Sequence, residues 1–255
     1  PNGHLYRYKP GSGNLEDLGR VSEIASFVWE MTEAPGGRLF LAMYPESEVI
    51  EYNTATGEFH NWGPAKKGED YCRSITWSEE TKKLYAGVGA HAALIEWDLE
   101  TGEKRDLLPE EYRDRHFVYT LDARKGKLIA KLDPKYDGFV MDAKTGEIEH
   151  KLPGYHSQTA SPVAPNGKDV FYSASGDLMR YGLEAKEHQA AHTDLGGNAK
   201  AFLYEKWKDE QALFVLTSGS NLVKYGLDSG EAEKTRLNLP GQPVALHSIV
   251  TGPDG

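Results

Sequence analysis

The stretch that decides the fold is residues 48–59, EVIEYNTATGEF. It joins a short apolar run to a tight turn built on Gly57, and the same arrangement returns along the chain. Glycine suits this turn because a positive φ is costly for a residue with a Cβ atom. The equivalent turn glycines are Gly13, Gly57, Gly102, Gly146 and Gly230. In a further copy, Lys186 stands where the glycine would be.

Two columns of apolar residues keep one interval along the chain. The first ends the apolar run five residues before each turn position, at Tyr8, Tyr52, Trp97, Met141, Tyr181 and Tyr225. Its successive spacings are 44, 45, 44, 40 and 44 residues. The second column consists of Phe40, Tyr85, Ile129, Phe171 and Phe214. Two columns in register indicate a structural repeat of about 44 residues.

Each repeat has the pattern of four short strands. In the first complete repeat these strands are expected near 27–32, 39–42, 48–52 and 59–62. The runs are rich in β-branched and aromatic residues and are bounded by Gly, Pro, Asn and Asp. Four strands in each 40–50 residues are typical of a propeller blade. We therefore predict an all-β fold, a β-propeller of four-stranded antiparallel blades.

The repeat predicts five complete blades with partial blades on either side. The complete blades are expected at 21–64, 69–109, 114–153, 156–196 and 199–239. Strands near 5–8 and 15–18 precede them, and a strand over 246–250 follows, before a turn at 252–255. We predict a single propeller domain over 1–255, incomplete at one or both ends, with six or seven blades in the intact ring. A closed six-bladed ring is the alternative, but a missing central strand would leave two unpaired edges.

Composition excludes several classes of partner. The chain has 39 acidic and 29 basic residues and a net charge of −10, which argues against nucleic-acid binding. No apolar run approaches the roughly 20 residues that a membrane-spanning helix needs. The single cysteine, Cys72, excludes a disulfide framework and a cysteine-based zinc site. We expect a monomer with no metal site and no cofactor, although Asp133 and Asp137 leave room for a structural or axial Ca²⁺.

Ligands of propellers usually lie over the central funnel, where two sets of loops meet. The candidate residues that enter the inner strands are Trp29, Tyr71, Arg73, Arg115 and His156. Those in loops between the second and third strands are Tyr44, His91, Lys135 and Tyr136. Phe27 and Phe117 are expected to be core residues, and Trp29 to be either core or a platform for a sugar ring. Four further histidines fall on outer strands and are interpreted as plain surface residues: His60, His150, His188 and His192.

Four segments carry a resemblance to a known group of proteins. They are residues 27–30 (FVWE), 42–45 (AMYP), 69–74 (EDYCRS) and 87–95 (GVGAHAALI). They resemble segments of secreted microbial seven-bladed propeller proteins that are similar to polysaccharide lyases of the L-rhamnose-α-1,4-D-glucuronate lyase type. The resemblance implies an extracellular, carbohydrate-active protein whose partner is a polysaccharide or oligosaccharide.

The resemblance implies β-elimination at a uronic acid. Arg73 would neutralise the carboxylate, His91 would remove the C5 proton, and Tyr71 or Tyr44 would protonate the leaving oxygen. The residues expected to bind the substrate are Trp29, His156, Tyr136, Lys135 and Arg115.

Two other classes of function remain open. A non-catalytic propeller could bind a carbohydrate or protein ligand over the funnel, with Trp29, Tyr44 and Tyr136 stacking on it. The discriminating feature is whether His91, a tyrosine and an arginine converge within hydrogen-bond reach. A metal-centred hydrolase or lactonase would need carboxylates gathered on the axis, and Glu30 and Glu46 are too few for that.

Overall fold

The computed structural model describes residues 3–238 and 248–252. Within these residues it contains 21 β-strands and one short 3₁₀ helix, Glu110–Tyr112. The chain divides into two compact units, each of which we describe by itself. Unit 1 comprises residues 1–135 and 142–147, and unit 2 comprises 136–141 and 148–255. Among the described residues, no helix has the length and apolar character needed to cross a membrane.

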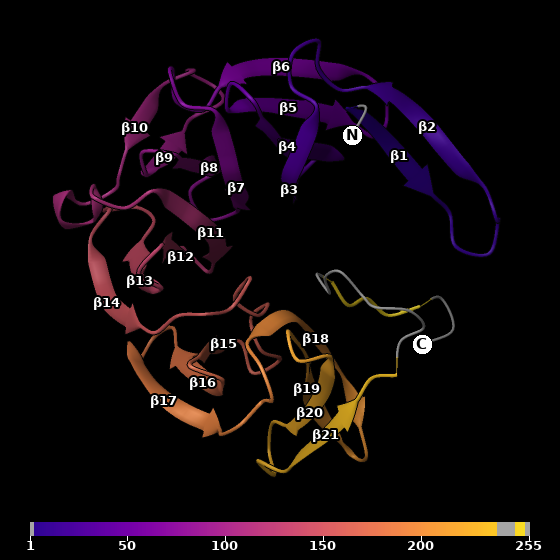
Figure 1. Ribbon diagram of the computed structural model, residues 1–255, viewed down its shortest axis with the longest axis vertical. Coiled ribbons are helices and arrows are strands. Elements are labelled where there is room, and N and C mark those ends of the chain that lie inside the picture. The colour runs from indigo at the N-terminus through magenta and orange to yellow at the C-terminus, as the bar shows by residue number, and fades with distance from the viewer. Residues whose placement is uncertain (1–2, 239–247, 253–255) are drawn as a thin grey trace. The chain divides into compact units, whose positions relative to one another are not determined.

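Unit 1 begins with a two-stranded hairpin of β1 (His4–Tyr8) and β2 (Leu15–Arg20). Two antiparallel blades of four strands follow, in which each strand pairs with the next along the chain; blade A is a separate sheet, whereas blade B belongs to a larger one (Figure 1). Blade A consists of β3 (Phe27–Ala34), β4 (Arg38–Tyr44), β5 (Glu48–Asn53) and β6 (Phe59–Pro64). Blade B consists of β7 (Tyr71–Ser78), β8 (Lys83–Gly89), β9 (Ala93–Trp97) and β10 (Lys104–Asp106). These strands confirm the predicted repeat.

The third repeat is divided between the units. Its hairpin of β11 (Phe117–Arg124) and β12 (Lys127–Asp133) belongs to unit 1, where β11 also pairs with β8. Its second hairpin, β13 (Asp137–Asp142) and β14 (Ile148–Pro153), belongs to unit 2 except for Asp142. We call the first strand of each repeat its inner strand.

Unit 2 continues with one three-stranded and one four-stranded antiparallel sheet. Blade D consists of β15 (Asp169–Ala174), β16 (Asp177–Gly182) and β17 (Glu187–His192). Blade E consists of β18 (Ala199–Trp207), β19 (Glu210–Thr217), β20 (Asn221–Gly226) and β21 (Ala232–Arg236). The strand predicted over 246–250 and the turn at 252–255 fall largely outside the described residues.

Blade D lacks the regular inner strand that the repeat predicts. The segment after Tyr155 makes an isolated bridge to β15 and scattered backbone hydrogen bonds, but no continuous ladder. The hydroxyl of Ser157 accepts from the amide of Ser173 in β15, which replaces a backbone contact with a side-chain contact. Pro162 has no amide hydrogen to donate to a ladder. The fourth inner segment therefore follows β15 without forming a strand.

Side chains explain why the repeated turns form. The Asp142 carboxylate accepts the backbone N–H groups of Lys144 and Thr145, each at 3.0 Å. Asn53 and Asp98 hold their turns in the same way. A hydrogen bond from Lys127, followed by the one from Thr145, lowers the pKa of Asp142 to about 2. These side chains satisfy turn amides that the ladder cannot pair.

The core of unit 1 lies between its blades. One cluster contains Phe40 and Val49 of blade A and Ile75, Leu84 and Trp97 of blade B, all nearly inaccessible to solvent. Trp62 packs against this cluster, with its ring centroid 6.2 Å from that of Trp97. These two tryptophans therefore pack between blades A and B.

Hydrogen bonds also join the inner strands of unit 1. The Glu30 carboxylate on β3 accepts the amide N–H of Ile75 on β7 at 3.0 Å, and Thr32 makes the equivalent contact further along β3. The Thr76 hydroxyl on β7 accepts the amide N–H of Ala123 on β11 at 3.1 Å. Polar side chains of one inner strand thus satisfy the open backbone edge of the next.

Candidate functional site

A β-bulge recurs at the same place in four inner strands. In β3, one extra residue stands between Val28 and Glu30, which pair with consecutive residues of β4. Strands β7, β11 and β18 carry the same irregularity. The four extra residues are Trp29, Arg73, Tyr119 and Lys200. A bulge re-aims the side chain of its extra residue, so the repeat gives these four side chains one common position.

The three bulge residues of unit 1 contact one another. The guanidinium carbon of Arg73 lies over two aromatic rings, 4.6 Å from the ring centroid of Trp29 and 4.0 Å from that of Tyr119. The ammonium nitrogen of Lys131 lies over the same Tyr119 ring at 4.4 Å. Arg73 is 8% exposed and Lys131 is 5% exposed. Two nearly buried cations thus share one aromatic ring, an arrangement that favours cation–π attraction.

An aromatic surface extends from this pair of cations. Trp29 lies 4.5 Å from Phe27 and 6.2 Å from Tyr71, measured between ring centroids. Tyr71 in turn lies 4.5 Å from Tyr44 and 5.4 Å from Phe117. Phe27 and Trp29 are 38% and 37% exposed. We call this surface the aromatic face, and its residues are Phe27, Trp29, Tyr44, Tyr71, Phe117 and Tyr119.

The Arg73 guanidinium makes neither a hydrogen bond nor an ion pair within the described part of the chain, although its charge acts on the nearby Glu30 carboxyl and opposes the rise of its pKa. Burial, with the nearby Asp122 carboxylate, raises the pKa of Glu30 to about 8, so Glu30 is mostly uncharged near pH 7. Asp122 itself is paired with Arg124 at 2.8 Å. The aromatic face therefore carries a local positive charge on a chain whose net charge is −10.

Tyr71 of the aromatic face is protonated at neutral pH. Burial and the adjacent Tyr44 raise the pKa of Tyr71 above its ordinary range. A neutral phenol both donates and accepts a hydrogen bond. Tyr71 can therefore orient a ligand beside the cationic Arg73.

His91 is engaged with Glu69 and not with the residues of the aromatic face. Its ring nitrogen Nδ1 lies 3.0 Å from the carboxylate of Glu69, which also accepts the His91 backbone N–H at 3.0 Å. The His91 side chain is 87% exposed. No described interaction joins His91 to Tyr44, Tyr71 or Arg73. Of the four residues predicted to be catalytic, three lie on or beside the aromatic face and the fourth does not.

The residues predicted to bind substrate fall into three groups. Trp29 belongs to the aromatic face, whereas Arg115 and Lys135 are both paired with Asp114. The Arg115 guanidinium also lies 5.6 Å from the ring centroid of Tyr112. In unit 2, Tyr136 and His156 stack on each other.

The Tyr136 and His156 rings have their centroids 4.7 Å apart and an interplanar angle of 20°. The Nδ1 atom of His156 lies 2.6 Å from the carbonyl oxygen of Gly154, and Tyr136 is 48% exposed. The pair forms a second exposed ring surface within unit 2.

Two residues of the site, Tyr119 and Lys131, were not predicted from the sequence. The sequence repeat aligned 115–117 with 27–29, but the structure aligns 117–119 with that segment. The hairpin of β7 and β8 is one residue longer than that of β3 and β4, and the connection to β11, which holds the short helix Glu110–Tyr112, is also one residue longer, so the bulge residues are spaced by 44 and then 46 residues. The sequence does contain a signal for this register, because the aromatic–valine–aromatic pattern of Phe117-Val118-Tyr119 repeats that of Phe27-Val28-Trp29.

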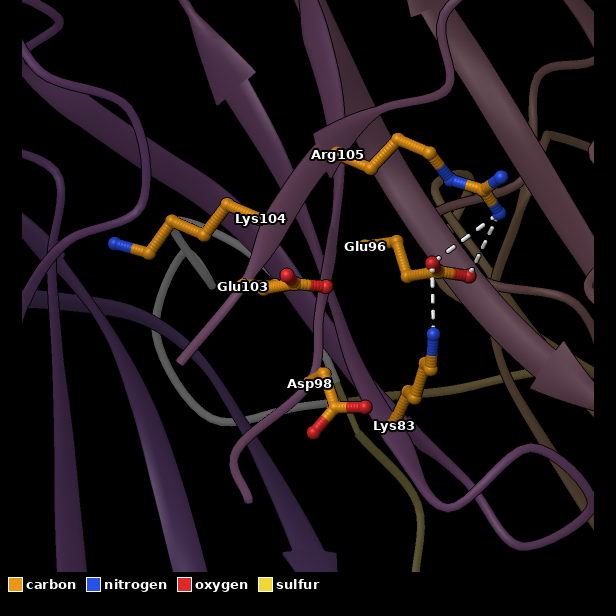
Figure 2. Close-up of a pocket in the computed structure, with 6 residues that line it drawn as sticks. All are labelled: Lys83, Glu96, Asp98, Glu103, Lys104 and Arg105. Carbon is orange, nitrogen blue, oxygen red and sulfur yellow. Dashed lines mark hydrogen bonds and ion pairs between the residues drawn. The ribbon is translucent and has the colours of Figure 1, made fainter. Parts of the chain in front are cut away.

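Unit 1 also has a hollow against the outer strands of blade B. It has a volume of about 520 Å³ and is lined by Lys83, Glu96, Asp98, Glu103, Lys104 and Arg105. Figure 2 shows Glu96 between Lys83 and Arg105, which it contacts at 3.0 and 3.2 Å, while Lys104 points away. Lys104 reaches the carbonyl oxygen of Pro64 at 2.6 Å. These charges are engaged with protein groups, in contrast to that of Arg73.

Within residues 3–238 and 248–252, no group of three or more His, Cys, Asp and Glu side chains is placed to hold a metal ion. Cys72 is buried, and burial raises the pKa of its thiol beyond the range in which a thiolate forms. The residues around Arg73 offer a ligand aromatic ring surfaces and a fixed positive charge.

Comparison with known proteins identifies the fold. No protein-family model matches the sequence, and neither does any curated protein. A chain in the solved structure "Crystal Structure of Mitotic Checkpoint Complex" matches with a TM-score of 0.65 and 14% identity, over 83% of this chain and 64% of that one. The structure "Crystal structure of RRP9 WD40 repeats" matches with a TM-score of 0.59 and 12% identity, over 78% and 60%. The structure "Structure of U3-55K" gives 0.59 and 12%, over 82% and 64%.

WD40 repeats form β-propellers. This chain has the β-propeller fold. The predicted all-β fold of repeated antiparallel blades is thereby confirmed. The chain spans 60–64% of the length of the solved chains that it matches. At this level of identity the likeness concerns the fold alone.

Proposed function

We propose that this chain is a non-catalytic binding module that holds a protein ligand on the aromatic face of unit 1. The observation that carries the proposal is the nearly buried guanidinium of Arg73, which has two aromatic rings against it, no hydrogen bond or ion pair to a described residue, and only the mostly uncharged Glu30 carboxyl near it. A buried charge without a partner is costly, and an anionic ligand group would offset that cost. The ligand therefore supplies the missing anion.

The surroundings of Arg73 define the ligand's chemistry. A guanidinium binds a carboxylate through two parallel hydrogen bonds, which favours an aspartate, a glutamate or a chain-terminal carboxylate. The exposed rings of Phe27 and Trp29 offer apolar contact beside that charge. The ligand is thus a segment with an acidic group next to an apolar side chain. One structural neighbour, a chain of a mitotic checkpoint complex, is part of an assembly, which supports a protein partner.

The position of His91 favours binding over β-elimination. The lyase hypothesis needs His91 within reach of the same sugar ring as Tyr71 and Arg73. His91 is instead paired with Glu69 and directed to solvent. This conformation therefore supports a binding role for Tyr44, Tyr71 and Arg73.

A peptide-display selection on the full chain, with glucuronate-containing oligosaccharides as a parallel probe, tests the proposal. We expect enrichment of peptides with an acidic residue beside an aromatic or aliphatic one. Arg73→Met should weaken binding of a selected peptide at least tenfold, which is about 1.4 kcal/mol, because the charge is lost and the chain length is kept.

The matched control is Lys200→Met, at the equivalent bulge of unit 2, and it should leave the affinity unchanged. Equal affinity of the Arg73→Met variant and the unaltered chain would falsify the proposal. Release of an unsaturated uronide from the oligosaccharides, seen by its ultraviolet absorbance and abolished in His91→Ala, would establish the lyase instead.

A further inference from the structure

Two histidines of unit 2 lie close together although their strands belong to different sheets. His150 lies on β14 and His188 on β17, with the His150 Nε2 atom 3.2 Å from the His188 Nδ1 atom. Their ring centroids are 4.5 Å apart and the ring planes make an angle of 71°. Both side chains are partly buried. The interpretation of His150 and His188 as plain surface residues therefore does not describe their environment.

A third polar atom meets the same nitrogen. The Tyr172 hydroxyl on β15 lies 3.0 Å from the His188 Nδ1 atom, so this nitrogen has two polar neighbours. A neutral imidazole nitrogen carries either one proton or one lone pair in the ring plane. It can therefore form one well-directed hydrogen bond, and the two neighbours must share it. A cation bound to this nitrogen would thus have two further donor atoms close by.

The spacing of the two nitrogens fits two ligands of a single metal ion. Imidazole nitrogens bind zinc at about 2.0–2.1 Å, so two of them on a tetrahedral ion stand about 3.3 Å apart. The observed separation is 3.2 Å.

The neighbouring groups hold the two strands together and leave room beside His188. Lys186, in the turn before β17, pairs with Glu149 of β14 at 2.7 Å. A hollow of about 270 Å³ adjoins His188 and is lined on its polar side by Asp169, Arg180, Glu187 and Gln189. An ion can therefore approach His188 and keep water molecules in its remaining coordination positions.

We propose that His150, His188 and Tyr172 form a binding site for one divalent transition-metal ion, with two imidazole nitrogens and a phenol oxygen as donors. Imidazole suits copper, nickel and zinc, and Cu²⁺ is the tightest binder among the divalent ions of this series. The site has two histidines and one tyrosine, and it is independent of the aromatic face and of the proposed function.

Titration of the full, tag-free chain with Cu²⁺ and Zn²⁺, followed by isothermal calorimetry, tests the site. We expect saturation at one ion per chain, with Cu²⁺ bound more tightly than Zn²⁺. The electron paramagnetic resonance spectrum of the Cu²⁺ complex should show coupling to two imidazole nitrogens. Lowering the pH to about 5 should release the ion as the imidazoles become protonated.

Substitutions assign the ligands. His150→Gln and His188→Gln should each weaken Cu²⁺ binding at least tenfold, whereas Tyr172→Phe should weaken it by a smaller factor. His60→Gln is the matched control, because His60 packs edge-on against the Trp62 ring, and it should leave binding unchanged.

A thermal scan shows whether each variant is folded, so that weaker Cu²⁺ binding is not mistaken for unfolding. One equivalent of Cu²⁺ should raise the melting temperature of the unaltered chain and of His60→Gln, but not that of His188→Gln. Absence of saturable one-site binding, or equal Cu²⁺ affinity of His188→Gln and His60→Gln, would overturn the proposal.

Discussion

The inner strands of both units contain a β-bulge at the same position, but the side chains at the bulges differ. In unit 1 the bulge residues are Trp29, Arg73 and Tyr119, and they contact one another. In unit 2 the equivalent position of β18 is Lys200, and the segment before β15 forms no regular strand. The repeat therefore fixes where a side chain points, and the residue type at that point makes the site. Three substitutions probe this difference, from the largest expected effect to the smallest.

The largest effect is expected at Gly87 on β8, where the second strand of blade B lies close against the inner strand β11. A Cβ atom at Gly87 would lie 2.6 Å from the carbonyl oxygen of Val118 and 2.9 Å from its Cγ1 atom. Gly87→Ala should therefore lower the free energy of unfolding by about 3 kcal/mol, because a backbone atom must move. Urea denaturation followed by tryptophan fluorescence measures this.

The control for this close approach is Gly182→Ala in unit 2. The nearest atom that its Cβ would meet is the Ala185 Cβ, at 3.3 Å. Its cost should stay under about 1 kcal/mol. An equal loss of unfolding free energy in the two variants would show that β8 and β11 are not closely packed at Gly87.

A pH-dependent change in stability is expected at Glu30, which directly follows the bulge residue of β3. The equivalent position of β18 in unit 2 is the uncharged Ala201. The pKa of this carboxyl is about 8 in the folded chain against 4.5 ordinarily, so the folded state holds the extra proton between these values. Stability contributed by the protonated group is present below pH 4.5 and is lost as the pH rises to 8. Glu30→Gln keeps an acceptor for the Ile75 amide and removes this loss.

Relative to the unaltered chain, Glu30→Gln should therefore gain about 2 kcal/mol between pH 5 and pH 9, allowing for screening at a partly exposed group. Urea denaturation at both pH values gives the difference. A stability difference that does not change with pH would mean that Glu30 titrates as an ordinary surface carboxyl.

The smallest effect is expected at Tyr119. Tyr119→Leu removes the ring that Arg73 and Lys131 share and should cost about 1 kcal/mol. Tyr119→Phe keeps the ring and should cost less than about 0.5 kcal/mol. Lys200→Ala in unit 2 should also stay within about 0.5 kcal/mol. Chemical denaturation of the three variants decides the point, and a Phe variant as unstable as the Leu variant would assign the effect to the hydroxyl.

The strands and turns of the fold could be predicted because local chemistry determines them. The strands near 27–32, 39–42, 48–52 and 59–62 occur as β3 to β6, and the turn glycines follow residues whose side chains hold the turn amides. Alternation and turn composition depend on neighbours in the chain, so the sequence displays them directly.

The register of the third inner strand could not be derived in the same way. One extra residue in the β7–β8 hairpin and one in the connection that holds Glu110–Tyr112 change the spacing by two residues, and a shift in register decides which side chain takes the bulge position. Arg115 was aligned with the site for this reason, whereas Tyr119 occupies the position. The irregular inner segment of blade D depends on Ser157 and Ser173, whose contact joins distant parts of the chain.

The candidate site was predicted in part. Trp29, Tyr44, Tyr71 and Arg73 lie together because the repeat places them on adjacent strands of unit 1. The pairing of His91 with Glu69 depends on the orientation of two side chains in loops, which spacing does not determine. Whether His91 acts in catalysis stays a prediction.

The hydrogen bonds between inner strands have a consequence for association between molecules. Glu30 and Thr76 each cover a backbone N–H group that a strand from another chain would otherwise pair with. These N–H groups are therefore not open to pairing with a strand of another molecule, which disfavours strand exchange and fibril growth. The same hydrogen bonds join neighbouring blades. A propeller that changes its ligand by substitution at the bulges can do so without exposing these edges, because Glu30 and Thr76 occupy other positions in the strands.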